Sequence, residues 1–169
     1  MIQRPQPNQY PVFAGTYVNM VPEGADVMQL LTDSLTETYE LFTTLPEEKH
    51  LYAYAEGKWT IKEVLGHIID TERVFAFRAF CFSREQIVLP GFDQDTYVDN
   101  TDYNGRSLAE LAEEFKVTRQ SNLHVFRNLT EEQLNRGTAS GNYLTVRALL
   151  FMAAGHELHH LRILKERYL

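Results

Sequence analysis

Helical spacing of apolar residues is the feature that most constrains the fold of this chain. After Pro22, apolar residues recur at steps of three and four over several long segments, which is the spacing of one face of an α-helix. The first such segment runs from Val27 to Phe42, and Pro46 ends it. Between these segments we find no run of alternating apolar and polar residues typical of a strand. The pattern therefore predicts an all-α fold.

Capping signals locate the starts of the later helices. Thr60 and Ser107 each precede a glutamate by three residues, the spacing of a capping box, and they predict helices over 60–83 and 107–128. Thr145 caps a last helix that runs almost to the end of the printed sequence and follows the loop NRGTASGNYL. Four principal helices joined by polar connections predict a four-helix bundle.

Two segments outside the helices are unusual. Residues 1–22 contain four of the six prolines, which excludes a long helix and predicts an extended arm that lies over the bundle or over a partner subunit. Residues 84–106 form a long loop between the second and third helices, and loops of this length often cover functional sites. The length of 169 residues fits a single domain over 1–169, with the bundle over 23–169.

Charge and hydropathy narrow the class of protein. The net charge is −7, and no cluster of lysines and arginines supplies the basic face that a nucleic-acid partner would require. No apolar run is long enough to span a bilayer, and the first residues lack the pattern of a signal peptide. We therefore expect a cytoplasmic protein with neither a nucleic-acid nor a membrane partner.

Histidines on the last helix are the strongest chemical signal. In TVRALLFMAAGHELHHLRILKERYL, His156 and His160 lie four residues apart, in line with apolar residues before and after them. Two imidazoles at this spacing can bind one ion at about 2.0–2.1 Å. His159 is rotated about 100° from His160 and falls beside the line. His67 lies close to the apolar face of the second helix and could complete the set. Spacing alone leaves a metal site and ordinary hydrogen-bonded histidines equally open.

The same stretch permits a second interpretation. HELHH fits the HExxH pattern, in which Glu157 would be the general base of a zinc protease. No strand precedes the helix to hold an extended peptide, so we do not favour a protease. Asp70 and Glu157 remain catalytic candidates that could orient a ligand imidazole or hold a metal-bound water. A solvated helix face is the alternative for both.

Four further residues are candidates for substrate binding. Arg78 is on the same side of the second helix as His67 and would suit an anionic group, although an ion pair with a neighbouring helix explains it equally well. The others lie in the long loop, where they could line a pocket mouth or simply form turns and the rim. They are Asp93, Asp95 and Tyr97.

Three stretches resemble the DinB-like superfamily, in particular its YfiT-type metal-dependent hydrolases. They are GKWTIKEVLGHIIDTERVFAFR, LPGFDQDTYV and TVRALLFMAAGHELHHLRILKERYL, and together they cover almost the whole chain in the family's order. The resemblance implies a bundle of up-down-down-up order, a histidine triad that binds nickel or zinc, and often a homodimer. The family's first histidine falls on His67, within GHIID. Its later pair falls on His156 and His160, within GHELHH.

The resemblance also implies a range of activities. Relatives include thiol S-transferases that use bacillithiol, mycothiol or glutathione, and a mycothiol-dependent isomerase. A bound metal would lower the pKa of a thiol or of a water, which makes either one nucleophilic near neutral pH. We expect a metal-dependent enzyme with a small-molecule substrate, which transfers a low-molecular-weight thiol to an electrophile or hydrolyses its substrate. The alternative is a non-catalytic, stress-associated binding protein with a structural ion.

Overall fold

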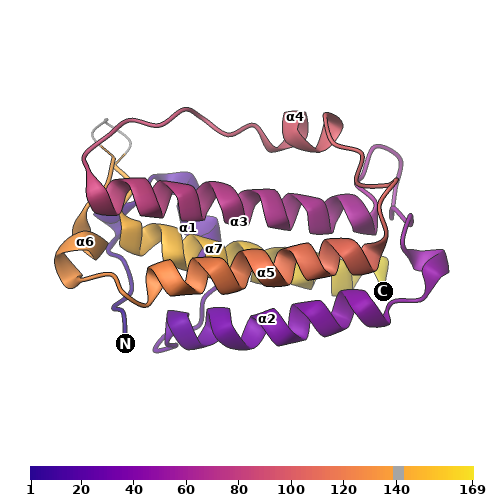
Figure 1. Ribbon diagram of the computed structural model, residues 1–169, viewed down its shortest axis with the longest axis horizontal. Coiled ribbons are helices and arrows are strands. Elements are labelled where there is room, and N and C mark those ends of the chain that lie inside the picture. The colour runs from indigo at the N-terminus through magenta and orange to yellow at the C-terminus, as the bar shows by residue number, and fades with distance from the viewer. Residues whose placement is uncertain (139–142) are drawn as a thin grey trace.

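Four long helices form a bundle in the computed structural model, which describes residues 1–138 and 143–169 (Figure 1). Part of the loop predicted over 135–144 lies outside the described residues. The described residues contain no strand, only an isolated bridge between Gly137 and Thr145. The predicted all-α four-helix bundle is confirmed. Its long helices are α2 (Val27–Thr44), α3 (Ile61–Arg84), α5 (Leu108–Phe126) and α7 (Val146–Ile163).

The helices follow an up-down-down-up order. α3 and α5 both run opposite to α2, and α7 runs parallel to α2 (Figure 1). Because α3 and α5 are parallel neighbours, the connection between them must travel back along the length of the bundle. This connection has the predicted length, but it is not without structure. It contains the short helix α4 (Gln94–Asp99), which packs against α3.

Side-chain caps fix the helix starts, as the sequence predicts. The hydroxyls of Thr60 and Ser107 accept from the backbone N–H three residues later, and both capping boxes are complete. The Thr145 hydroxyl accepts from the N–H of Ala148. The regular part of α7 ends at Ile163, and one wider turn follows over Leu164–Tyr168.

The N-terminal segment differs from the extended arm that the prolines predict. It folds into two 3₁₀ turns, Pro7–Gln9 and Val12–Ala14, followed by the short helix α1 (Gly15–Val18). Proline excludes a long helix, but its fixed φ suits the first position of a short turn. The segment lies against α7 of the same chain. α1 and α7 approach so closely that a Cβ on Gly155 would lie 1.8 Å from the carbonyl oxygen of Tyr17.

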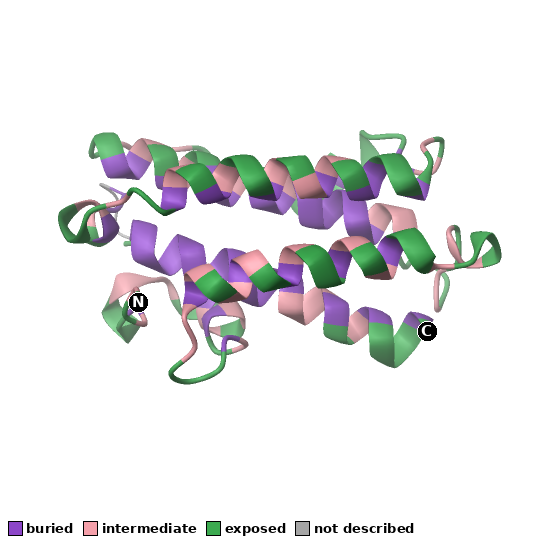
Figure 2. Ribbon diagram, turned by 60° about the horizontal axis from the view of Figure 1, so that its bottom comes forward, coloured by how far each residue is buried: buried purple, intermediate pink, exposed green. Residues whose placement is uncertain are grey.

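Buried residues face the interior of the bundle, and exposed residues face outward (Figure 2). α7 is the most buried helix, since every residue from Val146 to Glu157 is buried. α3 and α1 both pack against α7. His156 therefore lies in the core rather than on a surface face. None of the helices formed by the described residues has the length and hydropathy needed to cross a membrane.

Candidate metal centre

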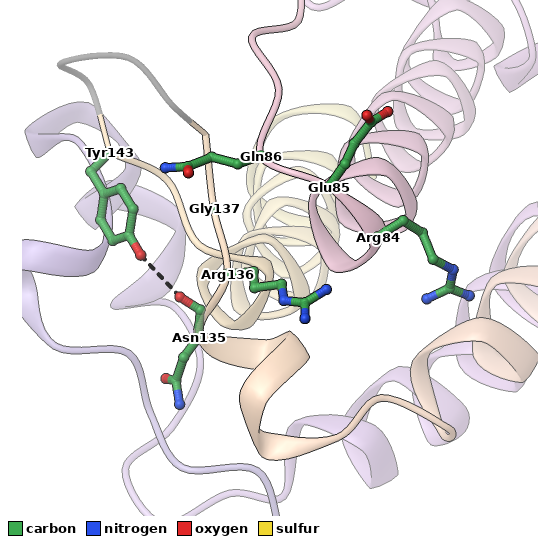
Figure 3. A pocket seen from close by; sticks show the side chains of 7 residues that line it. All are labelled: Arg84, Glu85, Gln86, Asn135, Arg136, Gly137 and Tyr143. Carbon is green, nitrogen blue, oxygen red and sulfur yellow. Dashed lines mark hydrogen bonds between the residues drawn. The ribbon is translucent and has the colours of Figure 1, made fainter.

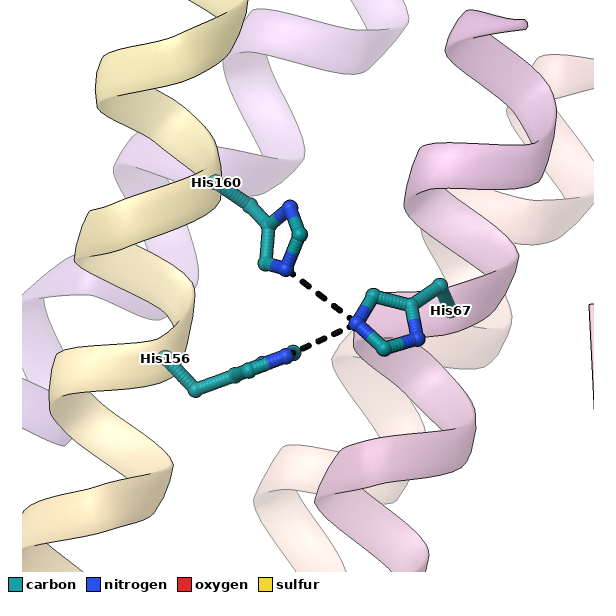
Figure 4. A group of neighbouring side chains, drawn as sticks. All are labelled: His67, His156 and His160. Atoms are coloured by element: carbon teal, nitrogen blue, oxygen red, sulfur yellow. Dashed lines mark hydrogen bonds between the residues drawn. The ribbon is translucent and has the colours of Figure 1, made fainter. Parts of the chain in front are cut away.

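Three histidines from two helices converge in the core. The Nε2 atom of His67, from α3, lies 2.8 Å from Nε2 of His156 and 3.1 Å from Nε2 of His160, both from α7 (Figure 4). α3 and α7 are antiparallel neighbours, so a residue early in α3 faces residues late in α7. The structure thus brings together the three histidines that the sequence singles out.

Burial keeps these three rings neutral. It lowers the pKa of His67 to about 4 and the pKa of His160 to about 3, and it holds the pKa of His156 well below its ordinary value. A protonated imidazole has no lone pair to give a metal, whereas a neutral one does. At neutral pH all three rings are therefore available as ligands.

The donor set fits a late first-row divalent ion. Around a tetrahedral ion with bonds of 2.0–2.1 Å, two ligand nitrogens lie about 3.3 Å apart. The two Nε2 separations of 2.8 and 3.1 Å come within a few tenths of an ångström of that value. Imidazole suits zinc and nickel in particular. Among the described residues, no fourth histidine, cysteine or carboxylate joins the group.

Aromatic and hydroxyl side chains that the sequence did not single out surround the triad. The Trp59 ring lies 4.7 Å from the His67 ring, and the Tyr17 ring meets His156 edge-on at 5.1 Å between centroids. Thr71 Oγ1 is 3.5 Å from Nδ1 of His67, which leaves Nε2 of His67 directed toward α7. These contacts restrict the orientation of the His67 and His156 rings.

Glycines before two of the histidines are a sequence signal for close packing beside the site, and one of them could have found Tyr17. In place of Gly66, a Cβ would lie 2.5 Å from the ring of Tyr103, and in place of Gly155 it would meet the backbone of Tyr17. A glycine lets another segment approach a helix backbone closely. The pair Gly-His occurs at His67 and again at His156. Each glycine marks a segment packed beside the site.

The structure places the two catalytic candidates away from the histidine rings. Asp70 accepts a 2.5 Å hydrogen bond from the hydroxyl of Tyr103 and faces Arg73, and it makes no hydrogen bond to His67. Burial raises the pKa of Asp70. Glu157 is only 1% exposed, so it does not lie on the solvated helix face that was its alternative. Its carboxylate points to a separate buried network.

That network centres on Arg119 of α5. Nε and Nη2 of Arg119 donate to the two carboxylate oxygens of Glu72, at 2.8 and 3.0 Å, and Nη2 also donates to Glu157 at 2.9 Å. The hydroxyls of Ser34 and Thr38 in α2 donate to Glu157 at 2.8 and 2.6 Å. The sequence holds a signal for this cluster, because all three charged residues fall on apolar stripes of their helices.

Two cavities reach the triad from opposite directions along the bundle. The first, here the His156-side cavity, has a volume of about 340 Å³ and is lined by His156, Phe75, Arg78 and Met152 among others. The second, here the His160-side cavity, has about 480 Å³ and extends toward the C-terminal end of α7. Its lining includes His160, Trp59, Lys58, Asp95, Asp99 and Tyr168.

The substrate-binding candidates are divided between these cavities and the surface. Arg78 lines the His156-side cavity and Asp95 lines the His160-side cavity. Asp93 lines neither and caps α4, where it accepts from the backbone N–H groups of Asp95 and Thr96. Tyr97 is half exposed and packs against Phe92 with ring centroids 4.8 Å apart.

A third cavity, of about 490 Å³, lies at the other end of α3 and includes none of the three histidines (Figure 3). Of its two arginines, Arg136 has an ion-pair partner and Arg84 has only a hydroxyl partner. Arg136 donates to the carbonyl of Ser83 and pairs with Glu132, and Arg84 donates to the hydroxyl of Ser83. Because the only group of possible metal ligands among the described residues is the triad, we consider the two cavities beside it as the candidate sites.

The fold and the histidine site together define a class of protein. The sequence model of the DinB superfamily matches residues 30–164, and the chain belongs to this superfamily. In structure it is similar to YfiT from Bacillus subtilis, described as "a probable metal-dependent hydrolase with an unusual four-helix bundle topology". The TM-score is 0.76 at 18% identity, with 94% of each chain covered, so this likeness shows the fold.

Two relatives are similar in sequence. The chain is 26% identical over 140 residues to an Oceanobacillus iheyensis protein named "Putative metal-dependent hydrolase", covering 76% of this chain and 79% of that one. It is 28% identical over 127 residues to YjoA of Bacillus subtilis, an uncharacterized protein, covering 73% and 74%.

Proposed function

We propose that this chain is a metal-dependent enzyme in which His67, His156 and His160 hold one divalent ion, nickel or zinc. The observation behind the proposal is the convergence of three neutral, largely buried Nε2 atoms on one point. The names of the Oceanobacillus iheyensis relative and of YfiT support a metal-dependent activity. The substrate we propose is a small molecule.

Catalysis is favoured over a purely structural ion. Structural zinc sites are closed by four protein ligands, whereas catalytic sites keep one position for water or substrate. Three histidines gather here, and two separate cavities reach His156 and His160. When bound, the ion would supply an open position at which the pKa of a thiol or a water is lowered.

The chain's own residues position and shield the site. Thr71 and Trp59 restrain the His67 ring, and Tyr17 covers the edge of His156. The two cavities offer separate spaces for two organic reactants, as transfer of a low-molecular-weight thiol to an electrophile requires. Hydrolysis requires one such space and a water, and the names of the relatives favour it. Both reactions therefore enter the test.

Trp59 provides a direct test of the metal site. It is the only tryptophan in the sequence, and its ring lies 4.7 Å from His67. We expect Ni²⁺ to quench its fluorescence at one equivalent, and elemental analysis to find one ion per chain. His67→Ala should abolish both signals, and the matched variant His159→Ala should keep them. Full metal occupancy in His67→Ala would refute the triad.

The reaction is tested on metal-loaded protein. We expect conjugation of bacillithiol, mycothiol or glutathione to monochlorobimane to be accelerated by the loaded protein and not by metal-stripped protein. Hydrolysis of p-nitrophenyl esters is measured in parallel. Acceleration with esters alone would assign hydrolysis. A fully loaded protein inactive with every thiol and ester would contradict both proposed reactions.

A further inference from the structure

Arg78 occupies an unusual position in the His156-side cavity. Thr71, Phe75 and Arg78 follow one another on α3 at steps of four and three, so they form one line along the helix. All three line this cavity, and His156 lies at its inner end. The cavity thus has a ligand histidine at one end and a guanidinium at the other.

The charge of Arg78 has no counterpart in the described part of the chain. Its Nη2 donates to the carbonyl of Pro90 at 2.9 Å, and none of the ion pairs among residues 1–138 and 143–169 includes it. The cavity lining contains no aspartate or glutamate. Burial without an anion lowers the pKa of Arg78. In a chain of net charge −7, the Arg78 guanidinium is thus a partly buried cation without an ion-pair partner.

The walls between the two ends are mainly apolar. Phe75 comes from α3, Met152 from α7, and Leu144 from the segment before α7. From Thr71 to Arg78 is seven residues, or about 10 Å along a helix. A volume of about 340 Å³ is at the lower end of the range of small-molecule sites. The space suits a compact ligand with an apolar middle.

We propose that the His156-side cavity binds a small apolar carboxylate, with its carboxylate on Arg78 and its apolar body against Phe75 and Met152. The opposite end of this ligand would place its reacting group beside His156. This part of the proposal rests on the proposed metal-dependent function. A phosphate monoester offers the same chemistry to arginine. It carries about two charges at neutral pH, and one guanidinium balances only one of them. The single cation therefore favours a monoanion.

Matched ligands test this proposal by calorimetry on zinc-loaded protein. The probes are 4-phenylbutanoate, the neutral 4-phenylbutan-1-ol, and phenyl phosphate. We expect the carboxylate to bind about tenfold to a hundredfold more tightly than the alcohol, as a charge-assisted hydrogen bond provides. Arg78→Met should weaken the carboxylate to the level of the alcohol and leave the alcohol unchanged. Arg84→Met, which removes an arginine outside this cavity, should change neither.

Two further variants guard against unfolding of Arg78→Met, and an NMR measurement locates the bound ligand. Arg78→Gln repeats the test if Arg78→Met unfolds, and Arg78→Lys should retain part of the preference. With ¹³C-labelled methionine methyl groups, 4-phenylbutanoate should shift the NMR signal of Met152. Equal binding of acid and alcohol, tighter binding of phenyl phosphate than of the carboxylate, or an unmoved Met152 signal would overturn the proposal.

Metal-free protein separates this proposal from the proposed function. We expect the carboxylate to bind His67→Ala with the same dependence on Arg78, because Arg78 is distant from the triad along α3. That result would stand even if the triad held no metal. Carboxylate binding that needs the metal and survives Arg78→Met would place the carboxylate on the ion, and it would refute the role of Arg78.

Discussion

At the scale of single residues, glycines decide how closely other segments approach the histidines. A side chain at Gly155 would overlap the carbonyl oxygen of Tyr17, and a side chain at Gly66 would overlap the ring of Tyr103. Both contacts lie one residue from a proposed ligand. The absence of a Cβ thus lets α1, whose Tyr17 lines the His156-side cavity, pack beside His156, and it lets Tyr103 pack on α3 next to His67.

Gly155→Ala tests the closer of these contacts. Alanine favours a helix interior by about 1 kcal/mol over glycine. Here its Cβ would lie 1.8 Å from a backbone oxygen that cannot move without the whole segment. We expect a net loss of about 1–3 kcal/mol in the free energy of unfolding, measured in urea. Gly91→Ala, with nothing within 4 Å of the new Cβ, is the control. Equal stability of the two variants would contradict the close contact.

At the scale of elements, one arginine links the four long helices. Arg119 of α5 binds Glu72 of α3, Glu157 of α7, and both Ser34 and the carbonyl of Leu31 in α2. Glu72 is five residues after His67, and Glu157 directly follows His156. Because the network fixes the register of α3 against α7, it also fixes how the proposed ligands meet.

Arg119→Met should be strongly destabilising. Removing one partner of a buried ion pair leaves the other charges without compensation, which costs about 3–5 kcal/mol. Two carboxylates would be left buried here. Lys116→Met is the matched control on the same helix, since Lys116 pairs with Glu113 at the surface, where such pairs contribute about 0–1 kcal/mol. Equal unfolding free energies for the two variants would show that the network contributes nothing.

At the scale of the whole molecule, the buried histidines link stability to pH. Burial, with a contribution from nearby His159, lowers the pKa of His67 to about 4, and burial lowers that of His160 to about 3. In the unfolded chain both pKa values return to about 6.5. Below pH 6.5 the unfolded state therefore binds more protons than the folded state. Stability is complete above this pH and falls as the pH drops toward 4.

Metal-stripped protein should show this dependence in urea unfolding at pH 7.5 and pH 5. For each ring, 1.5 pH units below 6.5 correspond to a loss of about 2 kcal/mol. His67→Gln removes one titrating ring and should show a smaller fall over the same interval. If both proteins lost the same stability, the folded-state pKa of His67 would not be depressed.

The sequence by itself determined the helices and the candidate ligands. Thr60, Ser107 and Thr145 fix helix starts through hydrogen bonds within their own first turns, so local chemistry suffices. His156 and His160 share a face because helix geometry places i and i+4 together. For His67, spacing indicated only a position near a core face, and the family resemblance indicated its partners.

Only the tertiary structure decided which groups meet across the bundle. Glu157 looks like a possible base because it adjoins His156, yet the helix turns it about 100° away and Arg119 binds it. The prolines exclude a long helix from the arm but do not show that α1 packs on Gly155. Arg78 could have had an ion-pair partner on another helix, but among the described residues it only donates to the carbonyl of Pro90. These outcomes depend on contacts between residues far apart in the chain, which local spacing does not encode.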